Sequence, residues 1–110
     1  MITTQEKIDT INKELKKQFA LREKLNKEFA DEYIVGRAFG YPEAEYFVYA
    51  IECDGKTVRS VVVQVYSQWM CIEDLPLKSN VFQRPITVQE FTGQVEKMKQ
   101  YFIGLTKKGE

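Results

Sequence analysis

Three neighbouring pairs of carboxylates are the residues of this chain whose types and spacing could do acid–base chemistry. They are Asp31 with Glu32, Glu43 with Glu45, and Glu73 with Asp74. Two carboxylates act as acid and base when their surroundings separate their pKa values. Each of these pairs falls in a turn or at the end of a predicted element, where solvent keeps both members ionised. We therefore assign no catalytic residue to them.

The other residue types that usually carry catalysis are scarce. The sequence contains no histidine, and Cys53 and Cys71 each stand alone. A serine or cysteine nucleophile usually needs a neighbouring imidazole, and catalytic zinc usually takes a histidine ligand. The acidic residues lack D-x-D or EF-hand spacing, and Gly36 and Gly40 complete neither glycine-rich phosphate motif. We expect a protein that is not an enzyme, with no catalytic, metal or cofactor-binding residues.

The length and the charge of the chain limit the classes of protein to which it could belong. A chain of 110 residues, 44% hydrophobic and 29% charged, is typical of a single globular domain spanning 1–110. Its 16 basic and 16 acidic residues are spread evenly, which disfavours nucleic-acid binding and membrane attraction, because both draw on clustered cations. No apolar run approaches the ~20 residues of a membrane span, and no secretory signal is recognisable. We expect a cytoplasmic protein with reduced cysteines.

A long helix is predicted to begin at Thr3, because Thr3 and Glu6 have the spacing of a capping box. Apolar residues then recur at helical spacing in two successive quartets that occupy neighbouring arcs of the helix. They are Ile8, Ile11, Leu15 and Phe19, followed by Leu21, Leu25, Phe29 and Tyr33. Two arrangements fit this drifting stripe. Either the helix packs on its own sheet, or its first half packs against another copy of the chain.

A second helix is predicted from Thr87, which forms another capping box with Glu90. Ile86 and Phe91 stand at the spacing of a hydrophobic staple. Apolar residues continue at alternating steps of three and four as far as Leu105. We expect this seam to face the core, with a partner helix as the alternative.

Between the helices, β-branched and aromatic residues predict strands over 33–39, 45–53 and 57–66, with a possible fourth at 69–72. The fold class is therefore α+β: a long N-terminal helix, a three- to four-stranded antiparallel meander sheet and a C-terminal helix, in the order α-β-β-β-(β)-α. Asp54 and Gly55 predict a two-residue hairpin turn. This turn would place Cys53 opposite Lys56, and Phe47 on the same face as Val58 and Val62. Both faces of this hairpin are apolar at mid-strand, so we expect both to be covered, by the two helices or by a partner.

The proline-bounded connection 73–85 carries an unusual apolar load for a solvent loop, namely Leu75, Leu77, Val81 and Phe82. Loop hydrophobics often form satellite clusters beneath their segment. We favour a segment tucked over the core, with presentation to a partner as the alternative.

The helix–sheet–helix order resembles the double-stranded-RNA-binding domain in topology. That family presents a lysine-rich start to its last helix, and the resemblance would place RNA contacts there. The matching stretch of this chain, residues 85–91, contains no lysine. The resemblance therefore does not extend to the residues that bind RNA.

These observations favour a non-catalytic protein–protein interaction module that forms a homodimer. Small stoichiometric inhibitors and adaptors of bacterial or phage systems share this profile. Tryptophan, phenylalanine and arginine are common interface anchors, and the predicted partner-binding residues are Trp69, Leu77, Val81, Phe82 and Arg22.

Two alternatives remain open. A nucleic-acid-binding domain could use a folded patch of Lys97, Lys99, Lys107, Lys108, Arg84 and Arg59, and its binding would weaken steeply with salt. A small-molecule-binding domain or minor enzyme would need a deep polar cavity near Tyr46, Tyr49 or Glu52.

Overall fold

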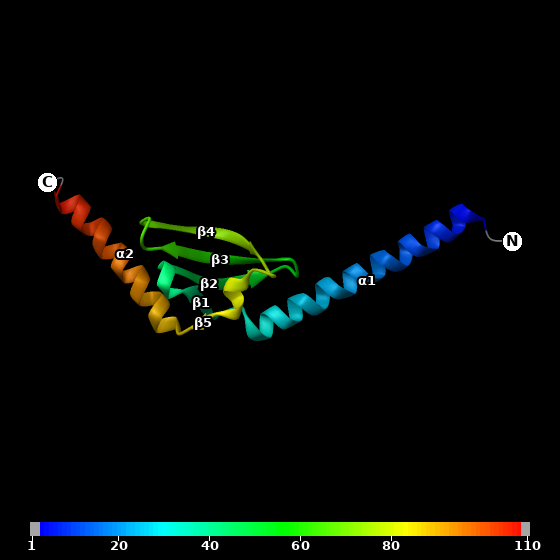
Figure 1. Ribbon diagram of the computed structural model, residues 1–110, viewed down its shortest axis with the longest axis horizontal. Helices are drawn as coiled ribbons and strands as arrows, with labels where there is room; N and C mark the ends of the chain where they lie inside the picture. The colour runs from blue at the N-terminus through cyan, green and yellow to red at the C-terminus, as the bar shows by residue number, and fades with distance from the viewer. Residues whose placement is uncertain (1–2, 109–110) are drawn as a thin grey trace.

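The computed structural model describes residues 3–108 and is elongated, with extents of 81 × 27 × 20 Å. A five-stranded antiparallel sheet forms its body, and the two helices lie at opposite ends of the molecule (Figure 1). The elements are α1 (Thr4–Tyr33), β1 (Ala38–Tyr41), η1 (Pro42–Ala44), β2 (Tyr46–Cys53), β3 (Thr57–Gln64), β4 (Trp69–Pro76), η2 (Asn80–Gln83), β5 (Pro85–Ile86) and α2 (Val88–Lys108). The predicted α+β class is confirmed, with five strands instead of three to four.

The strand order is β4-β3-β2-β1-β5. The fifth strand is two residues long and pairs with β1 through Ala38 opposite Ile86 and Phe39 opposite Pro85. It covers the first half of the β1 edge that a simple meander would leave open. The first predicted strand began too early, because α1 continues to Tyr33 and β1 starts only at Ala38.

The turn between β2 and β3 is longer than the two-residue turn that the sequence predicts. The Asp54 carboxylate accepts hydrogen bonds from the N–H groups of Lys56 and Thr57, both at 2.8 Å. These bonds stabilise a turn that places Cys53 opposite Val58. The register then shifts between Ala50 and Glu52, as expected of a β-bulge.

The changed register reassigns the faces of β3, because a one-residue slip exchanges the two faces of a strand. Val58 and Val62 share a cluster with Val48 instead of Phe47. The other face of β3 contributes Val63, in a cluster with Phe47.

Both faces of the sheet are covered in part, as the apolar hairpin predicts. On one face, α2 packs Phe91 and Met98 against Phe47 and Val63. On the other, the core combines strand residues with the end of α1 and with η2. Its buried members are Ala30, Ile34, Phe39, Val48, Ala50, Cys53, Val58, Val62, Leu75, Val81 and Phe82.

Most of α1 lies away from this core (Figure 1). Among its thirty residues only Ala30 is buried. A helix of this length spans about 45 Å at 1.5 Å per residue. The arrangement in which α1 packs along its own sheet is therefore wrong for all but the last turns of the helix.

Candidate protein-interaction surface

The capping box at the start of α1 is formed as predicted. The Thr3 hydroxyl accepts a bond from the Glu6 N–H at 3.1 Å, and the Glu6 carboxylate accepts one from the Thr3 N–H at 3.4 Å. These bonds satisfy backbone donors that a helix start leaves open. The helix therefore begins at a defined residue even though its described residues from 4 to 22 are all exposed.

Large apolar side chains line one side of the helix, and we call this surface the α1 stripe. Each of its members keeps between 42% and 58% of its surface exposed. Helical geometry places them within one half of the circumference. They are Ile8, Ile11, Leu15, Phe19, Leu21, Leu25, Phe29 and Tyr33. An exposed apolar surface of this extent is the most distinctive feature of the molecule, because soluble monomers rarely carry one.

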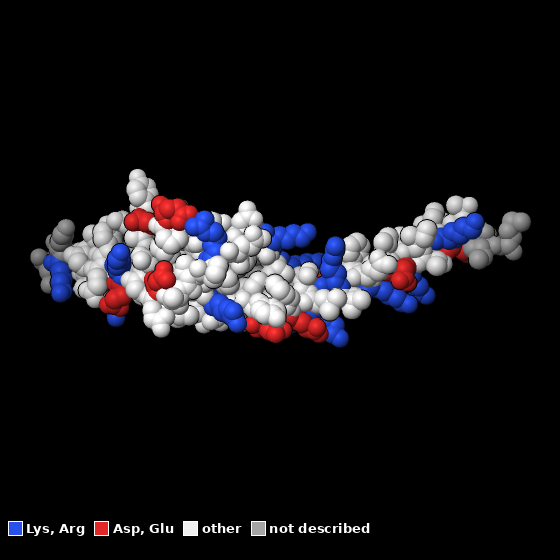
Figure 2. Space-filling view, turned by 60° about the horizontal axis from the view of Figure 1, so that its bottom comes forward, with Lys and Arg blue, Asp and Glu red and all other residues white. Residues whose placement is uncertain are grey.

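Charged residues of both signs surround the stripe, with Lys27 and Asp31 paired at 2.7 Å. Figure 2 shows blue and red side chains interspersed with white along the projecting helix and over the sheet. No single-sign field covers the face in view. The surface is therefore not built to attract a strongly charged polymer.

Beside the stripe, α1 and the segment after β4 enclose two successive hollows of about 440 and 370 Å³. Both are lined by Asn26, Leu77 and Lys78. Phe19 and Arg22 line the first and Phe29, Tyr33 and Phe82 line the second. We call these two hollows together the α1 groove. Sequence reasoning did not foresee it, because it depends on how α1 leaves the sheet.

The predicted partner-binding residues separate into three places. Arg22 and Leu77 both line the α1 groove. Val81 and Phe82 are buried, at 2% and 9% exposure, and the Phe82 ring meets Phe39 edge-on at 5.4 Å. These two residues belong to the core, so the tucked arrangement of the segment is confirmed, and only an edge of Phe82 reaches the groove.

Trp69 is exposed at the opposite end of β4 from Leu77. Eight strand residues separate the two positions by roughly 25 Å, so the structure does not bring Trp69 to the groove. Further apolar side chains are exposed near the open edge and on the second half of α2. They are Met70 and Ile72 from β4, and Tyr101, Phe102 and Leu105 from α2. The second half of the α2 seam therefore does not face the core, contrary to the prediction.

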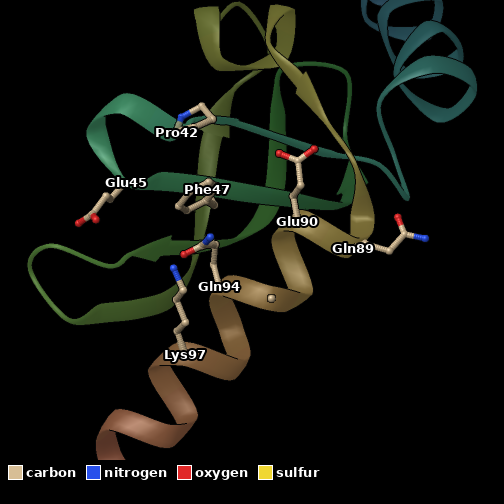
Figure 3. Close-up of a pocket in the computed structure, with 8 residues that line it drawn as sticks. Pro42, Glu45, Phe47, Gln89, Glu90, Gln94 and Lys97 are labelled. Atoms are coloured by element: carbon tan, nitrogen blue, oxygen red, sulfur yellow. The ribbon is translucent and has the colours of Figure 1, made fainter.

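Figure 3 shows a hollow of about 360 Å³ between the β1–β2 connection and the start of α2. Gln94 and Lys97 reach from α2 toward β2, whereas Gln89 points outward. The Glu90 carboxylate is already used, because it accepts a bond from the Thr87 N–H at 3.3 Å as part of the second capping box. With Gln89 turned outward and Glu90 held by the cap, the hollow offers no pair of free carboxylates and gives no support for acid–base catalysis.

The residues proposed for a small-molecule cavity do not meet either. Tyr46 and Tyr49 contact opposite core clusters, and the Tyr49 ring packs on Phe91 at 5.7 Å. Glu52 forms an ion pair with Arg59 at 3.3 Å. Within residues 3–108 no group of three potential ligands among His, Cys, Asp and Glu is close enough to hold a metal ion.

The cations proposed for nucleic-acid binding are dispersed. Arg84 pairs with Glu43 at 2.9 Å, and Arg59 lies between Glu52 and Asp74, each at 3.3 Å. Lys97 and Lys99 fall on different sides of α2, because positions two residues apart in a helix differ by about 200° around its axis. Lys107 is exposed farther along α2, and the Lys108 side chain lies outside the described residues.

The three acidic pairs lie at the surface, and each has a member in an ion pair. Asp31 pairs with Lys27, Glu43 with Arg84, and Asp74 with Arg59. Cys53 and Cys71 are free thiols, as expected, and Cys53 is buried.

No family model, curated protein or solved structure matches the chain. Across the part of the chain that the structure describes, no helix has the length and apolar character to cross a membrane.

Proposed function

We propose that this protein is a non-catalytic interaction module that works by docking the α1 stripe onto a protein partner. One observation carries the proposal: eight large apolar side chains stay about half exposed on a helix with a single buried residue. Exposed apolar surface is unfavourable in water, and larger patches typically mark protein or membrane contacts.

The stability of the helix supports this reading. Isolated helices are marginal in water, and most helical stability comes from packing an apolar face. Residues 4–22 of α1 are all exposed, so this half of the helix lacks such packing within one chain. A partner on the stripe would supply it.

The role that best suits such a module is stoichiometric. A small cytoplasmic inhibitor or adaptor, of a bacterial or phage system, would act by occupying the surface of a partner. Leu77 would contribute from the α1 groove, and Arg22 from the middle of the stripe, where it also lines the groove. Trp69 would belong to a separate contact.

A photo-cross-linking experiment tests the proposal on the full chain in its native cells. Benzoylphenylalanine is placed at Phe19, on the stripe, or at Ala20, which helical geometry places on the opposite side. We expect cross-linked protein adducts from position 19 and few from position 20. Equal yields from the two positions, or none from position 19, would rule out the stripe as the docking surface.

A further inference from the structure

Taking the proposed function as its basis, we infer that the α1 stripe is occupied by a second copy of this chain, paired antiparallel about a two-fold axis near residue 20. The spacing of the stripe carries this inference. Ile11 and Phe29 are equidistant from residue 20, as are Leu15 and Leu25. Between residues 11 and 29 this symmetry presents the same apolar pattern in either direction, so an antiparallel second copy matches that span layer by layer.

The layers follow the rule for antiparallel helix pairs. Between residues 11 and 29 the positions that face inward form two series with seven-residue spacing. They are 11, 18 and 25 in one series, and 15, 22 and 29 in the other. In the proposed register, Ile11 packs against Phe29 of the second copy and Leu15 packs against Leu25 of the second copy. Each of these contacts occurs twice because of the symmetry.

Gln18 and Arg22 form the central layer of this register. Each Arg22 guanidinium can donate to the Gln18 carbonyl oxygen of the second copy. A single polar layer in an apolar interface fixes register and number of strands at some cost in stability. Phe19 and Leu21 cover this layer from its two margins, because they lie on opposite edges of the stripe.

The α1 groove fits the same arrangement. Its helical wall presents Phe19, Asn26 and Tyr33 at seven-residue spacing, so the groove runs along one margin of the stripe. The N-terminal half of the second copy would lie along it, with Ile8 and Ile11 level with the hollow that Phe29 and Tyr33 line. The groove therefore continues the contact from the helix onto residues 76–83.

The available area is sufficient for a stable dimer. Aromatic side chains offer roughly 150 to 250 Å² each. With the lower end of that range taken for the five aliphatic members, eight side chains at half exposure present on the order of 700 Å² per copy. A specific interface takes about 800 Å² from each partner.

Charge contributes little to the choice of partner. In the proposed register Lys16 lies about 1.5 Å along the axis from the level of Glu23 of the second copy, on the groove side. On the other margin Glu14 lies about 3 Å from the level of Glu28 of the second copy, a like-charge pair. The symmetry of the apolar residues, and not the charges, therefore selects a second copy.

Cross-linking of paired variants tests both the occupant and the direction. Both native cysteines are first removed from the full chain by Cys53→Ala and Cys71→Ser. Leu15→Cys and Leu25→Cys are then made in separate copies of this chain, one of which carries a tag. The two proteins are mixed and treated with a short bis-maleimide. The antiparallel register predicts that the yield of dimer cross-linked between Leu15→Cys and Leu25→Cys is several-fold higher than the yield of dimer cross-linked between two copies of the same variant. Two Leu15→Cys residues would then lie about 15 Å apart along the axis. Ala20→Cys, on the outer side, is the control and should give little product.

The outcomes distinguish a failure of the antiparallel dimer from a failure of the proposed function. Dominant self-pairing of Leu15→Cys would show parallel helices and overturn the register. A wild-type chain that sediments as a monomer at several hundred micromolar would overturn self-association. If Phe19 still cross-linked to another protein in cells, the proposed function would stand. A dimer without any stripe cross-link would overturn both statements about α1.

Discussion

Gly55 lies directly against the backbone of α1 at Glu23. A Cβ atom at position 55 would come within 2.5 Å of the Glu23 carbonyl oxygen, and Gly55 has φ of +101°. Lys56, the next residue, pairs with the Glu23 carboxylate at 3.1 Å. The tip of the β2–β3 hairpin therefore supports α1 about one-third of the helix length from its end, and sets the direction in which the stripe projects.

Substituting Gly55 with alanine should disturb this support. Gly36→Ala is a matched control, because Gly36 also has positive φ, at +80°, but nothing lies within 4 Å of its Cβ position. Backbone strain alone should cost Gly36→Ala about 1 kcal/mol of unfolding free energy. Gly55→Ala should cost about 2 to 3 kcal/mol, because it adds a steric clash. Urea unfolding measures both, and equal losses would show that the close contact with Glu23 does not exist in solution.

Phe82→Ala should be strongly destabilising, because the side chain is buried against Phe39. Removing a buried phenylalanine typically costs about 3 to 5 kcal/mol. Trp69→Ala removes a larger side chain that is 40% exposed, and should cost clearly less. Chemical denaturation of the two variants makes the comparison. A small loss for Phe82→Ala would place the segment 77–84 away from the core.

Thr87→Ala should weaken the start of α2. The Thr87 hydroxyl accepts a bond from the Glu90 N–H at 3.0 Å, and loss of such a cap costs about 1 kcal/mol. Thr87→Ser keeps the acceptor and should retain most of the stability. Thermal unfolding followed by circular dichroism distinguishes them. If the serine variant lost as much as the alanine variant, the hydroxyl would not be acting as a cap.

Asp54 should make the stability of the β2–β3 turn depend on pH. Hydrogen bonds from the N–H groups of Thr57 and Lys56 hold the pKa of Asp54 below its usual 3.8. Because the folded pKa is the lower one, the stabilisation is fully present above the unfolded pKa and is lost as pH falls through the folded pKa. The stability difference between wild type and Asp54→Asn should therefore be constant at neutral pH and shrink at pH values below 3.8. A difference that did not change with pH would contradict this role.

The parts of the fold that depend on local signals are those that the sequence predicts well. Thr3 and Thr87 mark both helix starts, because a capping box is complete within four residues. The register of β2 and β3 was wrong because the bulge near Ile51 and the hydrogen bonds of Asp54 leave no periodic pattern. Strand β5 was missed because two residues cannot show alternation.

The candidate surface also has one part that the sequence predicts and another that depends on the tertiary structure. The helical spacing of the apolar residues predicts the α1 stripe, but whether the stripe faces the sheet depends on the direction of the helix. That direction follows from Ala30 and Ile34 in the core and from Gly55 against Glu23, contacts between residues far apart in the sequence. Arg22 was predicted as an anchor from its type alone, and its place in the groove comes from the tertiary structure.

Sedimentation equilibrium of the full chain is the most direct test that the protein works through the α1 stripe of two copies. Wild type should have the mass of two 12.9 kDa chains at tens of micromolar. Leu15→Lys should shift it to a single chain, because a charge would be buried in the interface. Ala20→Lys places the same charge on the outer side and should remain dimeric. A wild-type monomer throughout, or equal dissociation of the two variants, would contradict the account.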